Sequence, residues 1–246
     1  GKWMIRLVER EAERQRLLAL CEKTPFGCKI SSLARAYGFD KSFASFWLDT
    51  EADVVFCLVD GVMLLSGTVL DGGPVRLFLR AVGAQGILCA VRNAEELGLP
   101  ASQTGDVLKH FLLPGSDTPP PPMPISIRDI YALLEKTGMV DEFEPFYLDL
   151  SHKLRHGEAL ALTVEGVEGV AACAVVSSIS KTGAILSALA VEEDCRRQGL
   201  GSGLVREMES YFPGKNLYVF REKNKHREFY KKLGYVKIDT WVYAKL

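Results

Sequence analysis

A glycine-rich segment in the second half of the sequence holds the residues best suited to chemistry. An apolar stretch ends at Val191, a charged turn follows, and three glycines then alternate with other residues at the start of an amphipathic stretch. Glycines let a ligand approach the backbone closely, and the first turn of a helix offers unpaired N–H groups and a positive dipole end. Arg196 and Arg197 add positive charge beside the glycines. The segment therefore predicts a binding site for a phosphate group.

The spacing of the glycines decides between kinds of phosphate ligand. Gly199, Gly201 and Gly203 give G-x-G-x-G, whereas the dinucleotide-binding fingerprint needs G-x-G-x-x-G. No G-K-[ST] follows, so the loop typical of nucleoside triphosphate binding is excluded as well. The remaining pattern is R-x-x-G-x-G, made by Arg196, Gly199 and Gly201. Taken alone, these residues also fit a strand–turn–helix whose glycines only allow tight packing.

A second segment follows after an expected strand. Asn224 opens an expected helix, Tyr230 lies on it, and the helix ends at an L-G-Y triplet, residues 233–235. Taken alone, this is a basic helix with ordinary end residues, because glycine suits a helix C-terminus and lysines suit its dipole. In this order behind R-x-x-G-x-G, the two segments resemble the signature of the GNAT superfamily of acyl-CoA N-acyltransferases. The resemblance covers residues 159–246 well and residues 127–158 only by the order of elements.

The resemblance implies acetyl-CoA as co-substrate, held between two central strands at residues 184–191 and 217–220. The pantetheine would pair with the main chain at the end of the first strand, and the pyrophosphate would lie on the amides of residues 196–202. The cofactor-binding residues implied are Leu189, Ala190, Val191, Arg196, Arg197, Gln198, Gly199, Leu200, Gly201, Ser202, Asn224 and Tyr230.

The resemblance also implies direct transfer, in which a neutral amine attacks the thioester. Tyr230 would protonate the departing sulfur as general acid, with a half-buried helix aromatic as the alternative. The N–H of Val191 would polarise the thioester carbonyl. The general base is open between Glu192, Glu144 and water-relayed carbonyls, and Ser187 could touch either substrate.

The acceptor is less well indicated. Asp141, Glu142, Glu144 and Asp149 form an acidic set with no Lys or Arg between them. A solvated helix face explains this set, and a cationic acceptor such as an amine or polyamine is the alternative. We expect a small-molecule or peptide amine as acceptor, and neither nucleic acid nor a membrane as partner. The oligomeric state is open.

The function implied is therefore that of an acetyl-CoA-dependent N-acetyltransferase, an enzyme that moves an acetyl group to a primary amine. The alternative is a non-catalytic acyl-CoA-binding module that acts as a sensor or in protein interactions. No metal is expected. His152 and His156 have a spacing that could hold a metal on one helix face, but position 153 is not Glu and no third ligand is evident.

Composition limits the class of protein. The chain has 246 residues, 48% of them hydrophobic and 25% charged, with a formal net charge of −1. These values exclude a wholly disordered or coiled-coil chain and give no overall field toward nucleic acid or an anionic membrane. No apolar run approaches the roughly 18 residues of a membrane helix. None of the six cysteines forms a C-x-x-C pair, which favours reduced thiols and a cytoplasmic location.

The Pro-rich residues 114–124 divide the chain. Consecutive prolines have no N–H donors and cannot lie inside a helix or a sheet. We expect a first lobe at residues 1–113, a linker at 114–124 and an acetyl-CoA-binding GNAT domain at 125–246. A long surface loop within one domain is the alternative.

Both sides of this linker have the same order of expected elements, which suggests an internal duplication. The first side has a strand at 4–8, a helix at 9–23, helical segments at 30–50, a hairpin at 54–65 around Asp60-Gly61, a helix at 74–82, a strand at 87–91, a helix at 93–97 and a strand at 106–112. The second side has helices at 127–137 and 142–155, a hairpin at 159–177, a strand at 184–191, a helix at 199–211, a strand at 217–220, a helix at 225–233 and a strand at 240–245.

The first lobe lacks R-x-x-G-x-G. Only Asp71-Gly72-Gly73-Pro74 stands between its hairpin and the following helix. We therefore expect a degenerate lobe that does not bind acetyl-CoA. The fold class expected is α/β (α+β), a GNAT-like mixed central sheet flanked by helices, in two tandem lobes.

Overall fold

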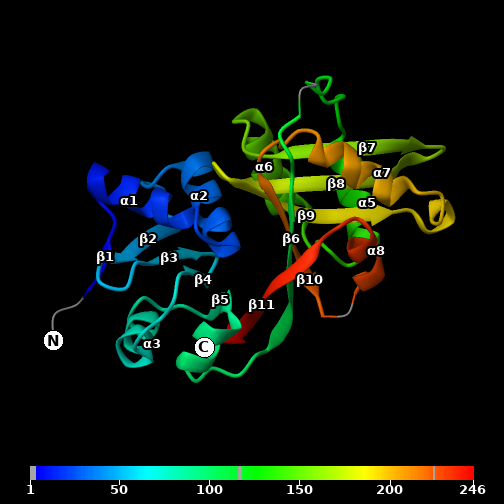
Figure 1. Cartoon of the computed structure of the whole chain (residues 1–246). Coiled ribbons are helices and arrows are strands. Elements are labelled where there is room, and N and C mark those ends of the chain that lie inside the picture. The colour runs from blue at the N-terminus through cyan, green and yellow to red at the C-terminus, as the bar shows by residue number, and fades with distance from the viewer. Residues whose placement is uncertain (1–3, 116–117, 224) are drawn as a thin grey trace. The chain divides into compact units, whose positions relative to one another are not determined.

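The computed structural model describes residues 4–115, 118–223 and 225–246, which form two compact units (Figure 1). Unit 1 consists of Gly1–Leu108, Phe220–Arg227 and Val236–Leu246, and unit 2 consists of Lys109–Val219 and Glu228–Tyr235. The chain therefore changes unit inside two strands, β6 (Gln103–Phe111) and β10 (Asn216–Glu222).

Unit 1 combines residues from the beginning and the end of the chain. The last strand, β11 (Val236–Lys245), belongs to unit 1. The Pro-rich residues belong to unit 2, where the Tyr211 hydroxyl donates a hydrogen bond to the carbonyl oxygen of Pro120 at 2.7 Å. That residues 114–124 act as a linker stays a prediction.

Unit 1 is built on a mixed sheet. Its strands, in spatial order, are β1 (Ile5–Leu7), β2 (Ala44–Asp49), β3 (Val54–Val59), β4 (Val62–Ser66), β5 (Gly86–Ala90) and β11. These neighbours are antiparallel except β4 and β5, which are parallel. The helices are α1 (Glu11–Cys21), α2 (Pro25–Tyr37), α3 (Gly72–Ala81) and α4 (Val91–Glu96).

Alternate residues of β3 separate two hydrophobic cores in unit 1. Val55 and Cys57 pack with residues of α1 and α2, whereas Val54 and Phe56 pack with residues of α3 and α4. Successive side chains of a strand point to opposite faces of its sheet. The helices therefore cover both faces.

Unit 2 has the same plan. Its strands, in spatial order, are the first part of β10, β9 (Gly183–Val191), β8 (Gly169–Ile179) and β7 (Leu160–Gly166). Only β9 and β10 are parallel among these neighbours. Around them lie α5 (Ile127–Lys136), α6 (Phe143–Arg155), the short 3-10 helix η1 (Glu193–Cys195), α7 (Leu200–Glu209) and most of α8 (Arg227–Lys232).

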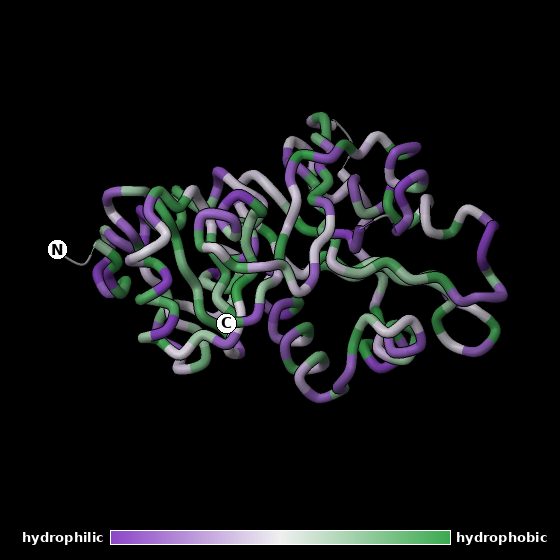
Figure 2. The backbone as a smooth tube through the Cα atoms, turned by 90° about the horizontal axis from the view of Figure 1, so that it is seen from below, coloured by the Kyte–Doolittle hydropathy of each residue, from purple (hydrophilic) through white to green (hydrophobic). Residues whose placement is uncertain are grey.

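The sheet of unit 2 is also covered on both faces. Cys173 and Val175 of β8 pack with residues of α5 and α6. Ala172 and Ala174 point to the opposite face, where α7 buries Leu204. Hydrophobic residues, green in Figure 2, gather along the strands that these helices cover. The mixed sheet flanked by helices confirms the fold class expected from the sequence.

One expected element is wrong. Residues 30–50 are not helical throughout, because α2 ends at Tyr37 and β2 follows. Gly38, with φ of 80°, ends the helix in a conformation that glycine adopts at no steric cost. Strand β2 alternates buried and half-buried residues and pairs with both β1 and β3. Pairing with strands elsewhere in the sequence therefore decided its structure.

The hairpin around Asp60 and Gly61 is confirmed. Strands β3 and β4 pair antiparallel, with Val59 opposite Val62. The two turn residues have φ values of 52° and 76°. Both are positive, as a type I′ turn requires.

Candidate active site

Strands β9 and β10 lie side by side only at their beginnings. Residues 183–186 of β9 pair with residues 216–219 of β10, and β9 then continues to Val191. Beyond Leu186, the side of β9 that faces away from β8 has no paired strand among the described residues. The second half of β9 therefore has an open edge.

The main chain of Leu189 and Val191 faces this open edge. The N–H of Glu192 donates to the carbonyl oxygen of Ala171 on β8 at 2.7 Å, and the register of β8 and β9 is regular over this stretch. Because N–H groups alternate between the two sides of a strand, those of Leu189 and Val191 point away from β8. Ala190 points its N–H toward β8. The geometry thus offers the first two residues, and not Ala190, to a ligand at the edge.

Helix α7 begins at Gly199, which has no side chain to cap it. This residue has φ of 77°, and its carbonyl oxygen accepts the N–H of Gly203 at 3.0 Å and the hydroxyl of Ser202 at 3.1 Å. The N–H groups of Leu200, Gly201 and Ser202 come too early to find acceptors within the helix. The start of α7 therefore offers bare N–H groups at the positive end of its dipole.

The three glycines of the loop differ in backbone conformation and in the space around each for a Cβ. Gly199 needs its left-handed conformation, which L side chains rarely adopt. A Cβ on Gly201 would lie 3.6 Å from both Phe229 and Val191, an ordinary contact. A Cβ on Gly203 would meet nothing within 4 Å. Packing therefore does not require glycine at Gly201 and Gly203. Their lack of side chains leaves the backbone of the first turn of α7 uncovered.

The charged residues of the loop lie on the surface. The Arg196 Nε donates to the carbonyl oxygen of Val191 at 3.3 Å, which ties the loop to the end of β9. Arg196, Arg197 and Gln198 are exposed, and Arg197 also has a positive φ, of 66°. Bare N–H groups beside exposed guanidinium groups fit the phosphate group predicted from the sequence.

Glu192 is poorly suited to act as the general base. Its Oε1 lies 2.5 Å from the Nζ of Lys136 on α5. This hydrogen bond lowers the pKa of Glu192 and raises that of Lys136. A carboxylate with a lowered pKa accepts a proton less readily. Lys136 could not be found from the sequence, because 56 residues separate it from Glu192.

Tyr230 lies on α8 and is buried, with 6% of its surface exposed. Its ring contacts the rings of Phe229 and Tyr235, with centroid distances of 5.0 Å and 5.6 Å. Phe229 is also the residue that a Cβ on Gly201 would touch. Helix α8 therefore packs beside the start of α7, as the proposed cofactor site requires. Asn224 lies outside the described residues.

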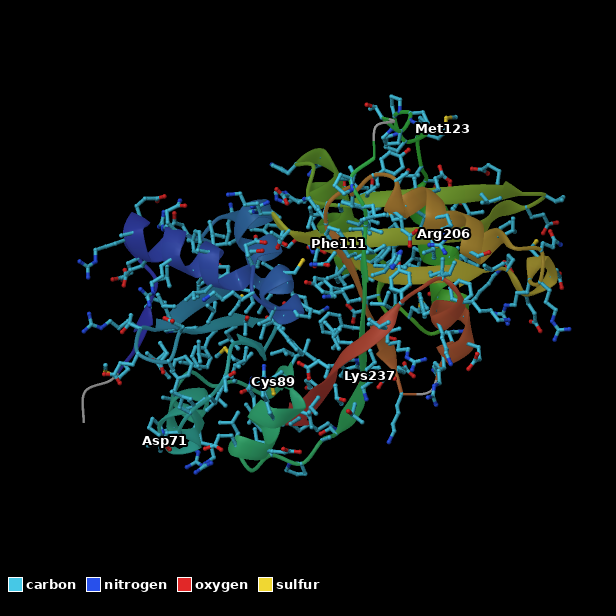
Figure 3. The ribbon with its side chains drawn as sticks, in the orientation of Figure 1. Asp71, Cys89, Phe111, Met123, Arg206 and Lys237 are labelled. Atoms are coloured by element: carbon cyan, nitrogen blue, oxygen red, sulfur yellow. The ribbon has the colours of Figure 1, made fainter. Side chains whose placement is uncertain are left out.

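A hydrogen bond ties Tyr235, three residues after the end of α8, to the last residue of α7. The Tyr235 hydroxyl donates to Oε2 of Glu209 at 2.7 Å, and Oε1 of Glu209 lies 2.9 Å from Nη1 of Arg206 (labelled in Figure 3). Burial, together with the hydrogen bond to the carboxylate, raises the pKa of Tyr235. This phenol therefore stays protonated and holds the two helices together. Sequence reasoning missed Glu209, because nothing in its local pattern names its partner.

The acidic residues considered for acceptor binding are solvent-exposed or form an ion pair. Asp141, Glu142 and Glu144 are exposed, and Asp149 pairs with the buried Lys153 at 3.0 Å. Glu144 and Asp149 lie on α6, whereas Asp141 and Glu142 precede it, so the set spans a loop and a helix. The choice between a solvated face and a cationic acceptor stays a prediction.

The rings of His152 on α6 and of His156, which caps this helix, lie close together and tilted by 30°. The ring centroids of His152 and His156 are 4.1 Å apart. Across residues 4–115, 118–223 and 225–246, no three or more His, Cys, Asp or Glu side chains gather as a metal site. Within the same residues, every helix is too short or too polar to span a lipid bilayer.

Comparison with known proteins points to one family. Residues 157–237 match the family model described as an acetyltransferase (GNAT) domain. No curated protein matches the chain. The matched residues run from β7 through α8 and so include β9, α7 and the whole of α8.

Solved structures extend the likeness of fold to the whole chain. A GCN5-related N-acetyltransferase from Sphaerobacter thermophilus is 12% identical with a TM-score of 0.63, over 100% of this chain and 96% of its own. A GNAT-family acetyltransferase from Colwellia psychrerythraea is 12% identical with a TM-score of 0.59, over 98% and 99%. A tandem GNAT protein from the clavulanic acid biosynthesis pathway is 13% identical with a TM-score of 0.56, over 97% and 96%.

Proposed function

We propose that the chain is an acetyl-CoA-dependent N-acetyltransferase, because residues 157–237 match the family model of the acetyltransferase (GNAT) domain. It would move an acetyl group to a primary amine by direct transfer. The observation that carries the proposal is the start of α7. There, bare N–H groups and exposed arginines replace the side-chain cap that ordinarily satisfies a helix N-terminus.

The cofactor-binding residues follow from this geometry. The N–H groups of Leu200, Gly201 and Ser202 would hold the pyrophosphate, with Arg196 and Arg197 adjacent. The main chain of Leu189 and Val191 would pair with the pantetheine along the open edge of β9. Gln198, exposed in the same loop, would add a contact, and Asn224, outside the described residues, is proposed as a further one.

The proposed chemistry needs two protein groups. The amine nitrogen bonds to the thioester carbon, the carbon–sulfur bond breaks, and the sulfur leaves as a thiol. The phosphates would lie beyond Val191, so the thioester comes at the Leu189 end of the pantetheine pairing. We therefore give the stabilisation of charge on the thioester oxygen to the N–H of Leu189, and not to that of Val191 which the resemblance implies. Tyr230 would supply the proton to the sulfur. The proton lost by the amine would pass to solvent through water held by main-chain carbonyls.

A second candidate is a non-catalytic acyl-CoA-binding module, and the state of Glu192 favours it. This carboxylate is engaged by Lys136, so the nearest acid to the end of β9 is not a free base. Acetyl transfer by the wild-type chain separates the two candidates, because only an enzyme turns acetyl-CoA over.

The acceptor we propose is a small-molecule or peptide amine. We propose neither nucleic acid nor a membrane as partner. All six cysteines are free thiols, five of them buried, which supports the cytoplasmic location expected from the sequence. That location stays a prediction.

Calorimetric titration with acetyl-CoA tests the cofactor site. We expect micromolar binding by the wild type and its loss in Gly201→Glu, because the new carboxylate would stand at the start of α7 where the phosphate would lie. Gly203→Glu is the matched control, since it adds the same charge two residues on, at an open position. It should keep most of the affinity. A wild type without affinity, or equal loss in both variants, would contradict the proposed site.

A further inference from the structure

Ser187 is an exposed polar residue in an otherwise apolar strand. Leu186 beside it is 3% exposed and Ala190 is 5% exposed, whereas Ser187 lies on the surface. It is also the first residue of β9 beyond the stretch that pairs with β10. The serine therefore stands where the two parallel strands stop pairing.

The register of β8 and β9 is irregular at this point. Val175 faces Ala188, Val176 faces Leu186, and the register shifts on both sides of Val176. Ser177 and Ser187 thus have no register partners and form a bulge in each strand. Their hydroxyls meet there, with the Ser177 Oγ donating to the Ser187 Oγ at 2.6 Å.

The hydrogen bonds leave Ser187 one acceptor position. Its own hydroxyl proton goes to the carbonyl oxygen of Val175 at 3.1 Å. A serine oxygen has one proton and two lone pairs, and Ser177 takes one lone pair. The remaining lone pair can accept an N–H. A neutral hydroxyl is too weak a base to take a proton from an amine, so this oxygen orients an N–H group and does not remove its proton.

The position along β9 indicates which substrate Ser187 would meet, and this step depends on the proposed function. The pyrophosphate would lie at the start of α7, so the acyl end would extend back along β9 from Val191 toward Leu189. Each residue of a strand advances about 3.3 Å, which places Ser187 about 7 Å beyond Leu189 in the same direction. A nucleophile that reaches the thioester from the side opposite the phosphates therefore passes Ser187.

We propose that Ser187, oriented by Ser177 and Val175, binds the acceptor amine through its Oγ. It accepts one N–H of the neutral amine, which directs the nitrogen lone pair toward the thioester carbon. Ser187 is thus a residue that recognises the acceptor and leaves the binding of acetyl-CoA unaffected. Ser177 is a positioning residue that acts through it.

The test compares Ser187→Ala with Ser187→Thr, which keeps the hydroxyl on a residue that strands favour. Ser210→Ala is the matched control, because that serine also donates to a backbone carbonyl, of Glu207 at 2.6 Å, but lies at the end of α7. The amine probes are putrescine, Nα-acetyl-lysine and a short peptide with a free N-terminus. Acetyl-CoA affinity is measured by calorimetry, and acetyl-CoA hydrolysis without amine is measured in parallel.

Loss of one hydrogen bond to the amine predicts that Ser187→Ala lowers kcat/KM for the best amine by about tenfold. The acetyl-CoA affinity and the hydrolysis rate should stay at the wild-type value, and Ser187→Thr should restore most of the transfer. Ser210→Ala should match the wild type throughout.

Two results would overturn the inference alone: unchanged amine transfer in Ser187→Ala, or an equal fall in transfer, hydrolysis and acetyl-CoA affinity. A wild-type chain that binds acetyl-CoA but acetylates none of the amine probes overturns the proposed function, and this inference with it.

Discussion

Each unit has a strand followed by a loop and a helix, and the two loops differ in what satisfies their amides. In unit 1, between β4 and α3, the Asp71 carboxylate accepts the N–H of Gly73 at 3.0 Å. The buried Asn93 side chain accepts the N–H of Val69 at 2.9 Å and donates to the carbonyl oxygen of Gly67 at 2.8 Å. In unit 2, α7 starts at Gly199 without a side-chain cap. In the first loop, side chains of the protein accept the backbone N–H groups. At the start of α7, no side-chain cap does so.

The charges beside the two helix starts also favour a phosphate group at α7 and not at α3. Asp71, labelled in Figure 3, places a negative charge at the positive end of α3, which would repel a phosphate group. At α7 the adjacent exposed residues are Arg196 and Arg197. This supports the expectation that the first lobe does not bind acetyl-CoA, which stays a proposal.

The glycines show why helix-initial glycine alone does not indicate a ligand. A Cβ on Gly72, at the start of α3, would overlap the backbone carbonyl oxygen of Glu96. That glycine is required by packing. Gly201 and Gly203 on α7 have room for a Cβ, so packing does not explain them, and the surface at Gly201 is available to a ligand. The cap and the neighbouring atoms distinguish the two cases, and the glycine spacing alone does not.

The largest expected effect tests whether the chemistry belongs to unit 2. Tyr230→Phe should lower kcat about 100-fold, because general acid catalysis contributes at least that factor in typical enzymes. The affinity for acetyl-CoA should stay within about twofold by calorimetry, since the ring and its packing remain. Tyr243→Phe, on β11 of unit 1, is the control and should leave kcat unchanged. Unchanged turnover in Tyr230→Phe would remove Tyr230 from the mechanism.

A smaller effect separates packing glycines from open ones. Gly72→Ala should lower the free energy of unfolding by about 1–3 kcal/mol, because the new methyl group forces the backbone of α3 and α4 apart. Gly203→Ala, in open space on α7, should raise it by about 0.5–1 kcal/mol, since alanine favours a helix over glycine. Urea unfolding of both variants gives the values. Equal changes would mean that the two helix starts do not differ in packing.

Much of this fold could be predicted from the sequence, because local signals were strong. The Asp60-Gly61 turn, the helix after Gly199 and the strand that ends at Val191 each have a pattern within a few residues. Strand β2 could not be predicted, since its six residues become a strand by pairing with β1 and β3. The return of β11 to unit 1 also depends on distant pairing, with β5.

The site divides in the same way. The loop at Gly199 and Tyr230 on α8 belong to linear motifs, so they could be identified from the sequence. The residues that support them meet across long separations, as Glu209 meets Tyr235 and Lys136 meets Glu192. Such a pair of distant side chains leaves no hydrophobic periodicity and no fixed residue spacing in the sequence. Only the packed structure reveals it.

The smallest expected effect tests whether the Asp71 cap alone prevents the loop before α3 from binding acetyl-CoA. Asp71→Ala removes the carboxylate that accepts the N–H of Gly73, and loss of such a cap costs about 1 kcal/mol of stability. Ser126→Ala is the matched control, because it removes the cap of α5 in unit 2 and should cost a similar amount. Calorimetry should find one acetyl-CoA per chain in Asp71→Ala as in the wild type, because Asn93 still engages Val69 and Gly67 in the same loop. A second bound acetyl-CoA would mean that a single aspartate separates the two lobes, and that the first retains a site which its own cap closes.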